Sequence, residues 1–176
     1  MDTLFAGKLF KVVRKYVTGR SGEQLERHVI LHPGAVAIIP VLDDGSIVLL
    51  KQYRVAADRY LIELPAGTID DGEEPRETAR RELVEETGYA PTSLTELTAF
   101  FSSPGILREK MHLFLATDLV AGPTDLEDGE EIERFTVPLE QTIEMIYNGK
   151  ITDGKTILGL LWYWNSKRLE CEHPGP

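Results

Sequence analysis

Apolar residues recur along the chain in short runs separated by turn residues, a pattern that predicts a fold rich in strands. Two such runs, 34–42 and 46–52, flank the turn Asp43-Asp44-Gly45, a combination typical of a β-hairpin. Segments 9–18 and 24–31 flank a polar turn and predict a second antiparallel hairpin near the N-terminus. Further strands are expected at 61–64, 94–102, 111–117 and 132–137.

Three segments have the period of a helix. The first, 75–87, has Pro75 in its first turn and Gly88 just past its end. The other two, 139–148 and 156–167, lie near the C-terminus. Strands and helices together predict an α/β (α+β) fold, and a chain of 176 residues suits one domain. Within this single domain, 1–176, we expect an N-terminal β region over 1–33 and a core over 34–168.

The charge balance restricts the partners of the chain. There are 29 acidic and 19 basic residues, which give a formal net charge of −10. General nucleic-acid binding is therefore not expected, and an anionic substrate needs bound cations or a local basic cluster. The single cysteine, Cys171, cannot form an internal disulfide, and no Cys/His spacing typical of a zinc site occurs.

No apolar run approaches the roughly 20 residues that span a bilayer. The apolar residues at the N-terminus are interrupted by Lys8, Lys11, Arg14 and Lys15, a pattern unlike that of a signal peptide. We therefore expect a soluble, cytoplasmic protein that does not enter a membrane.

The middle helix carries an unusual group of carboxylates. At about 100° per residue, Glu82, Glu85 and Glu86 fall within one arc of the helix. They repel one another, and the last two lie in the final turn, where the helix dipole favours cations. One interpretation is a solvated face with the i,i+4 pairs Glu77–Arg81 and Arg81–Glu85, the usual outcome for a glutamate-rich helix. The alternative is a site for a hard divalent cation, which prefers several oxygen ligands.

The spacing around this helix resembles the Nudix box of the Nudix hydrolases, a family that hydrolyses nucleoside diphosphates linked to another moiety. Tyr89 is a departure, because the pattern prefers an aliphatic residue at that position. The matching positions run from the loop before the helix to the glycine after it: Gly67, Glu73, Arg81, Glu82, Glu85, Glu86 and Gly88.

This resemblance implies an α/β/α sandwich with a mixed sheet, in which a loop–helix–loop segment binds Mg²⁺, with Mn²⁺ able to substitute, at two or three ions per site. It also implies that Arg81 orients the glutamates and that Glu73 accepts donors that fix the loop. The implied metal ligands are the carbonyl of Ala66 and the carboxylates of Glu82, Glu85 and Glu86.

Downstream of the box, the chain resembles the ADP-ribose pyrophosphatase subfamily. Pro104 lies fifteen residues after Tyr89, at the position of the subfamily's marker proline, although Ser-Pro-Gly is turn chemistry in any protein. The resemblance implies that Gly105 and Glu109 contact the substrate. The intervening segment 106–108 is more apolar and basic than is usual in the subfamily.

Upstream matches extend the resemblance to about residues 27–160 and include 32–36, 52–54 and 63–67. Arg54 stands where the subfamily has an arginine near the diphosphate, and a guanidinium fork suits phosphate oxygens. A plain surface charge at the end of a strand is the alternative. Arg27 is a candidate for nucleotide contact, although His28 replaces the glutamate that commonly follows it.

The acidic loop 126–132 resembles the catalytic loop of the subfamily, although such loops are often only solvated. Glu130 is the first candidate to bind a metal or deprotonate the attacking water, with Asp128 and Glu131 next. Together with Glu85 and Glu86, it completes the implied catalytic residues.

The resemblance implies hydrolysis of ADP-ribose to AMP and ribose 5-phosphate. Another nucleotide sugar such as GDP-mannose is the alternative substrate, and a non-catalytic nucleotide-binding sensor is the alternative class. The resemblance also implies a homodimer in which the N-terminal strands of each subunit complete the nucleotide pocket of its partner.

Overall fold

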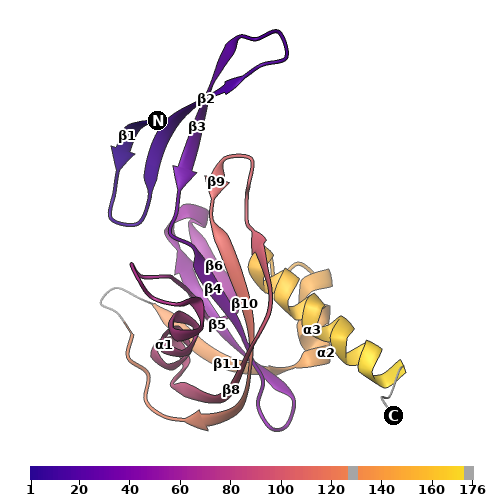
Figure 1. Cartoon of the computed structure of the whole chain (residues 1–176). Coiled ribbons are helices and arrows are strands. Elements are labelled where there is room, and N and C mark those ends of the chain that lie inside the picture. The colour runs from indigo at the N-terminus through magenta and orange to yellow at the C-terminus, as the bar shows by residue number, and fades with distance from the viewer. Residues whose placement is uncertain (127–130, 173–176) are drawn as a thin grey trace.

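A small N-terminal sheet stands beside a layered core in the computed structural model, which describes residues 1–126 and 131–172 (Figure 1). The strand order of this sheet is β1-β2-β3-β9. The first three strands are antiparallel neighbours, whereas β9 pairs in parallel with the end of β3 and so links the sheet to the core. The bounds are β1 Asp2–Ala6, β2 Lys11–Thr18, β3 Gln24–Leu31 and β9 Leu107–Arg108.

The central sheet of the core has the order β7-β4-β10-β8 and is mixed. Its two inner strands, β4 and β10, run in parallel, and the outer pairs are antiparallel. Every residue of β4 is buried, which explains why this strand is an almost unbroken apolar run rather than an alternating one. The bounds are β7 Ala66–Thr68, β4 Ala35–Pro40, β10 Lys110–Ala121 and β8 Tyr89–Phe101.

A second core sheet has the order β11-β5-β6 and is antiparallel throughout. The predicted turn at Asp43–Gly45 joins it to β4, and the Asp44 carboxylate accepts a hydrogen bond of 2.9 Å from the Ser46 amide. A short 3₁₀ helix, Val55–Ala57, connects β5 to β6. The bounds are β5 Ser46–Arg54, β6 Arg59–Glu63 and β11 Ile132–Pro138.

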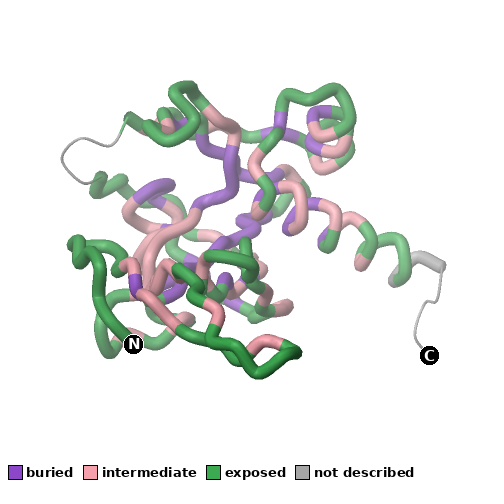
Figure 2. The backbone as a smooth tube through the Cα atoms, turned by 90° about the horizontal axis from the view of Figure 1, so that it is seen from above, coloured by how far each residue is buried: buried purple, intermediate pink, exposed green. Residues whose placement is uncertain are grey.

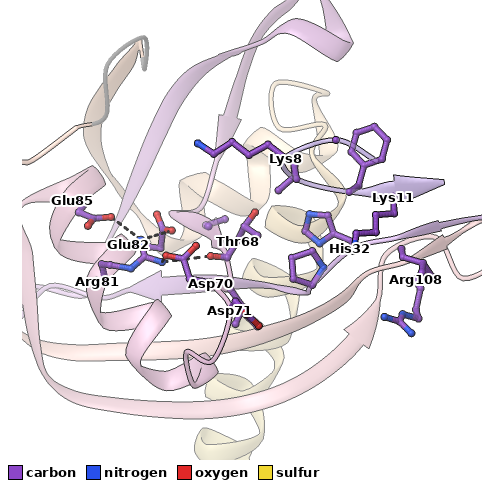
Figure 3. A pocket seen from close by; sticks show the side chains of 18 of the residues that line it. Lys8, Lys11, His32, Thr68, Asp70, Asp71, Arg81, Glu82, Glu85 and Arg108 are labelled. Carbon is purple, nitrogen blue, oxygen red and sulfur yellow. Dashed lines mark hydrogen bonds and ion pairs between the residues drawn. The ribbon is translucent and has the colours of Figure 1, made fainter. Parts of the chain in front are cut away.

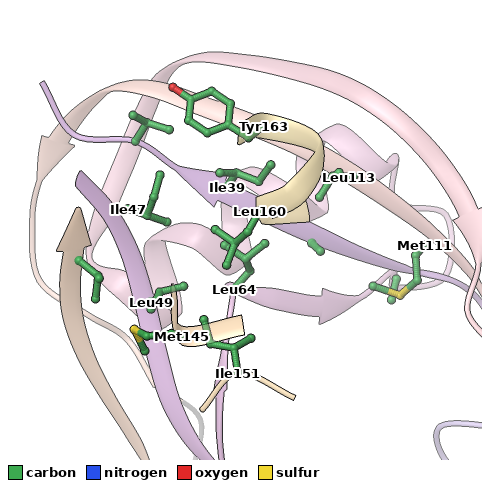
Figure 4. Packing of buried hydrophobic residues seen from close by; sticks show 14 residues of the cluster. Ile39, Ile47, Leu49, Leu64, Met111, Leu113, Met145, Ile151, Leu160 and Tyr163 are labelled. Carbon is green, nitrogen blue, oxygen red and sulfur yellow. The ribbon is translucent and has the colours of Figure 1, made fainter. Parts of the chain in front are cut away.

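Helices lie on both sides of the core, α1 on one side and α2 and α3 on the other (Figure 1). Side chains of alternate residues in β4 pack against opposite faces of the central sheet. Val36 and Ile38 pack in a cluster with Leu83 of α1, whereas Ile39 joins the larger cluster with Leu160 of α3 (Figure 4). This is the expected α/β/α arrangement with a mixed sheet. The bounds are α1 Pro75–Thr87, α2 Leu139–Tyr147 and α3 Gly154–Glu172.

Burial is concentrated where these layers meet, and most of the N-terminal sheet is exposed (Figure 2). Several of its large apolar side chains face solvent in the single chain: Leu4, Phe5, Leu9, Phe10, Tyr16 and Val17. Among the described residues, no helix is both long enough and apolar enough to cross a membrane.

Three short strands, β1, β7 and β9, were not predicted, and the start of β8 was placed too late. The first strand of the chain, β1, was not predicted, because its five residues show no clear alternation. Strand β8 was predicted to begin at Leu94 but begins at Tyr89. Gly88 adopts a left-handed conformation with φ of 70° and turns the end of α1 directly into β8. Ala90, Pro91 and Ser93 pair with the end of β10, and this pairing extends the strand.

Leu83→Ala is expected to lower the free energy of unfolding by about 2–4 kcal/mol, because Leu83 is fully buried between α1 and the central sheet. Urea denaturation measures this loss. Leu169→Ala, at a position 58% exposed on α3, is the control and is expected to change stability by less than about 0.5 kcal/mol. An equal loss in both variants would contradict the assignment of Leu83 to the core.

Candidate functional site

Two adjoining pockets, of about 880 and 640 Å³, open between the N-terminal sheet and the core. The larger pocket is bounded by the β1–β2 turn, the end of β5, the loop that follows β7, and α1 (Figure 3). The smaller pocket extends toward the N-terminus of α3 and toward residues 100–102, at the end of β8. The residues that line both pockets are Leu9, His32, Arg54, Ala66, Gly67 and Thr68.

The carboxylates of α1 lie against the strand that carries Gly67. Glu86 is almost fully buried, and its Oε2 accepts a hydrogen bond of 2.9 Å from the Ala66 amide. The Glu82 carboxylate occupies the space where a Cβ at Gly67 would lie. Any larger residue at position 67 would therefore displace Glu82, which explains the glycine in structural terms.

Arg81 holds the glutamates of this helix in place (Figure 3). Its Nη1 atom lies 2.8 Å from a Glu82 oxygen and 2.9 Å from a Glu85 oxygen. Its other edge makes two hydrogen bonds of 3.0 Å with the carboxylate of Glu73. The hydrogen bonds with Glu73 and the neighbouring glutamate charges raise the pKa of Arg81 well above its ordinary value.

Glu73 braces the loop before the helix. Besides Arg81, its carboxylate accepts a hydrogen bond of 2.8 Å from the Thr78 hydroxyl and one of 3.4 Å from the Asp70 amide. The hydrogen bond with Arg81 is the largest cause that lowers the pKa of Glu73 to about 2. Glu73 therefore stays ionised and keeps Arg81 oriented toward the glutamates of α1.

The oxygen donors at this site fit a hard divalent cation. Three carboxylates of α1 and the Ala66 carbonyl belong to the same pocket wall, and this donor set suits Mg²⁺. In the described part of the chain, no three acidic, His or Cys groups already surround one point. Arg81 instead draws the carboxylates of Glu82 and Glu85 to itself, so a bound cation would compete with a guanidinium for the same oxygens.

Basic residues balance the acids in the larger pocket. Lys8 lines it from the β1–β2 turn, Lys11 from the start of β2, and Arg108 from β9 (Figure 3). The sequence prediction missed these three residues, although a basic N-terminal run in an acidic chain was a usable signal. The lining contains the cations Lys8, Lys11, Arg54, Arg81 and Arg108 and the acids Asp70, Asp71, Glu82, Glu85 and Glu86.

Arg54 lines both pockets from the end of β5. Its Nε and Nη2 donate hydrogen bonds of 2.8 and 2.7 Å to the carboxylate of Glu63. The same carboxylate accepts a hydrogen bond from Lys155 Nζ. The sequence prediction did not assign a role to Glu63 or Lys155, because their contact joins β6 to a helix 92 residues later.

Of the other predicted site residues, some line a pocket and some do not. Glu109 lines the smaller pocket, where one of its oxygens lies 3.6 Å from His32 Nδ1. Gly105 and Arg27 are exposed and are not part of either pocket lining, and the Arg27 side chain donates a hydrogen bond of 2.8 Å to the Glu26 carbonyl. Glu131 accepts a hydrogen bond of 2.7 Å from the Tyr60 hydroxyl. Glu130 and Asp128 lie outside the described residues.

The aromatic residue that departs from the box pattern has a partner of its own. The Arg134 guanidinium lies 5.0 Å from the centre of the Tyr89 ring, a cation–π contact. Arg134 also donates a hydrogen bond to the Thr87 carbonyl at the end of α1. Tyr89 thus contributes to holding the C-terminal end of the helix against β11.

Comparison with known proteins agrees with this geometry. Residues 31–158 match the NUDIX domain. The chain is 36% identical over 173 residues to an ADP-ribose pyrophosphatase of Bacillus subtilis, covering 97% of this chain and 94% of that protein. It is also 36% identical over 134 residues to a GDP-mannose pyrophosphatase of Cronobacter sakazakii, covering 71% and 70%.

A solved structure shares the fold. The crystal structure of an ADP compounds hydrolase superposes with a TM-score of 0.82 at 25% identity, covering 95% of this chain and 92% of the other. The chain therefore belongs to the Nudix family, as its domain match and its relatives show. Its fold and its glutamate-bearing helix are consistent with this family.

Glu73→Gln is expected to lower the free energy of unfolding by about 1–2 kcal/mol at pH 7, after allowance for solvent screening. Because the folded pKa of Glu73 lies near 2 and below its ordinary value of 4.5, its contribution is complete above pH 4.5 and is lost as the pH falls toward 2. The gap between wild type and variant should therefore narrow over that range in urea denaturation with EDTA present.

Glu77→Gln is the matched control, since Glu77 is exposed on the same helix. Its free energy of unfolding should differ only slightly from that of the wild type, and this difference should not follow the same pH dependence. A constant gap between wild type and Glu73→Gln from pH 7 to pH 2 would contradict the role of Glu73.

Proposed function

We propose that this protein hydrolyses the diphosphate bond of ADP-ribose, or of a closely related ADP-sugar, to give AMP and ribose 5-phosphate. The observation that carries the proposal is one pocket lined both by the glutamates of α1 and by a group of basic side chains. Such a pocket suits an anionic substrate that binds together with metal cations. The similarity to ADP-ribose pyrophosphatases over nearly the whole chain supports the choice of nucleotide.

We propose Mg²⁺ as the ion, with Mn²⁺ as a substitute and two or three ions per site. The ligands would be the Ala66 carbonyl and the carboxylates of Glu82, Glu85 and Glu86, with Glu130 as a further ligand or as the base. When bound, the metal supplies charge neutralisation at the diphosphate and a water of lowered pKa.

The chain's own residues then bind and orient the substrate. Arg54 would contact the diphosphate through the edge of its guanidinium that faces away from Glu63. Lys8 and Lys11 would add positive charge from the opposite side of the pocket. Glu109 and Gly105 remain proposed contacts of the ribose side, and Arg27 of the nucleotide.

GDP-mannose is the second candidate substrate, and the similarity to GDP-mannose pyrophosphatases favours it over other nucleotide sugars. A non-catalytic sensor is less well supported, because a protein that only binds nucleotide has no need for all three glutamates of α1. A panel of nucleotide sugars assayed with Mg²⁺ and coupled phosphatase release separates these possibilities.

In that panel, ADP-ribose is expected to have the highest kcat/KM, with at least about a tenfold advantage over GDP-mannose, or about 1.4 kcal/mol in transition-state binding. A tenfold preference for GDP-mannose would reverse the substrate assignment. Tight ADP-ribose binding without turnover at any Mg²⁺ or Mn²⁺ concentration would favour the sensor.

Glu86→Gln is expected to lower kcat by about 10²-fold or more while the chain stays folded, because it removes a proposed metal ligand. Glu77→Gln, on the same helix but outside the pocket lining, should retain wild-type rates. Normal turnover in Glu86→Gln, with circular dichroism unchanged, would contradict the assignment of the metal site.

We also propose a homodimer formed through the N-terminal β region, residues 1–33. Large apolar side chains of this sheet are exposed in the single chain, among them Leu4 and Val17, and such exposure is typical of an interaction surface. The turn between β1 and β2 already lines the pocket of its own chain, so association of this sheet with a second copy would bring the two pockets near the interface.

Val17→Asp is expected to weaken dimerisation by about tenfold or more, because it places a charge on the proposed interface. Val120→Asp introduces the same change at an exposed valine in β10, outside the N-terminal sheet, and serves as the control. Sedimentation velocity at micromolar concentration measures both variants. A wild-type monomer, or equal dimerisation of the two variants, would contradict the proposed interface.

A further inference from the structure

A buried carboxylate behind the pocket joins three elements of the core. Glu63, at the end of β6, is only 1% exposed. One of its oxygens lies 2.8 Å from Arg54 Nε, and the other accepts hydrogen bonds from Arg54 Nη2, at 2.7 Å, and from Lys155 Nζ. A single buried anion therefore binds two cations, one from β5 and one from the first turn of α3.

The network continues into the N-terminus of α3. Lys155 Nζ also lies 3.1 Å from Asp153, whose carboxylate caps the helix by accepting hydrogen bonds from the amide and hydroxyl of Thr156, at 3.0 and 2.6 Å. The Thr156 hydroxyl in turn accepts a hydrogen bond of 2.8 Å from the Leu64 amide, beside Glu63. The position of Lys155 relative to Glu63 is thus fixed by backbone as well as by charge.

Folding alone does not favour this arrangement. A carboxylate removed from water needs partners, and replacement of such a buried ion network by apolar residues is often neutral for stability. A lysine in the first turn of a helix is also disfavoured by the helix dipole. Burial by itself raises the pKa of Glu63, but Arg54 and Lys155 outweigh that effect and hold the pKa below its ordinary value. The carboxylate is therefore ionised, and the network keeps its charges.

Both cations face the substrate pockets. Arg54 lines the two pockets and Lys155 lines the smaller one, whereas Glu63 is not part of either lining. The bond with Glu63 occupies the Nε–Nη2 edge of Arg54, so the remaining edge is presented away from Glu63, and the side chain is 38% exposed. One carboxylate behind the pockets therefore sets the geometry of two cations, Arg54 in both pockets and Lys155 in the smaller one.

We propose that Glu63 is a positioning residue that holds Arg54 and Lys155 as a fixed pair for the phosphate oxygens of the substrate, and that Lys155 is a substrate-binding residue. The proposal rests on the proposed function, because it assumes a diphosphate in these pockets. It adds a second cation that lines the smaller pocket, whereas the glutamates of α1 line the larger one.

Glu63→Gln tests the positioning role. Glutamine has nearly the same shape but only one acceptor oxygen, and its NH₂ group cannot accept the hydrogen bonds that now come from Arg54 Nη2 and Lys155 Nζ. We expect KM for ADP-ribose to rise about tenfold while kcat changes by less than about threefold, the pattern of lost uniform binding. Glu63→Asp keeps the charge and should restore part of the affinity.

Glu133→Gln is the matched control, because Glu133 pairs with Lys51 at 3.3 Å on the exposed side of the same sheet. It should leave KM unchanged. A lowered melting temperature of Glu63→Gln with an unchanged KM would show that Glu63 only stabilises the fold, and would overturn the proposal.

A double-mutant cycle tests the link to Lys155. Lys155→Met alone is expected to raise KM about three- to tenfold, and its effect should largely disappear in the Glu63→Gln background, because the lysine is no longer held there. Effects of the two substitutions that multiply independently would overturn the proposed coupling.

Calorimetric titration of inorganic pyrophosphate with Mg²⁺ gives a readout that needs no turnover. The dissociation constant should rise in Glu63→Gln and in Lys155→Met but not in Glu133→Gln. A wild type that binds pyrophosphate with this dependence but hydrolyses no nucleotide sugar would refute the proposed function and leave the cation pair standing. Active wild type with unchanged pyrophosphate affinity in both variants would refute only the cation pair.

Discussion

Mutual repulsion among the carboxylates of α1 is the constraint that the rest of the site offsets. Three glutamates in the last two turns of one helix repel one another and lie at the wrong end of the helix dipole. The structure compensates with Arg81, which contacts Glu82 and Glu85 directly and is itself held by Glu73. Glu86, the most buried of the three, is held by the Ala66 amide. Arg81 and the Ala66 amide therefore offset the repulsion among the three carboxylates.

The same constraint explains the glycine and the aromatic residue at the two ends of the motif. Gly67 leaves space for the Glu82 carboxylate, so the approach of β7 to α1 depends on the missing side chain. At the other end, Tyr89 and Arg134 hold the last turn of the helix, where a carbonyl of α1 accepts a hydrogen bond from the arginine. An aliphatic residue at position 89 would offer no cation–π contact to Arg134, so the departure from the family pattern has a local partner.

The sequence predicts local features well and long-range contacts poorly. The span of α1 was predicted correctly because Pro75 and Gly88 mark its ends, and β4 and β5 because an apolar run on each side of Asp-Asp-Gly leaves few alternatives. The start of β8 was missed because pairing with β10, rather than any apolar period, holds those residues in a strand. The glutamates were found by their spacing, whereas Lys8 and Lys11 line the pocket only because the β1–β2 end of the N-terminal sheet lies against it.

Glu63 illustrates why a buried charge is difficult to interpret from sequence. In the strand 59–63 it is one more polar residue near a surface turn, and its partners lie 9 and 92 residues away. Only the folded chain shows that its carboxylate is inaccessible and bonded to two cations that face a pocket. The glutamates of α1 line the larger pocket, Lys155 lines the smaller one, and Arg54 lines both. A diphosphate with its metal ions carries both signs of charge, and the proposed site would offer both. A chain of net charge −10 can in this way bind an anion, because the sign of the local field is set by a few fixed side chains rather than by the total.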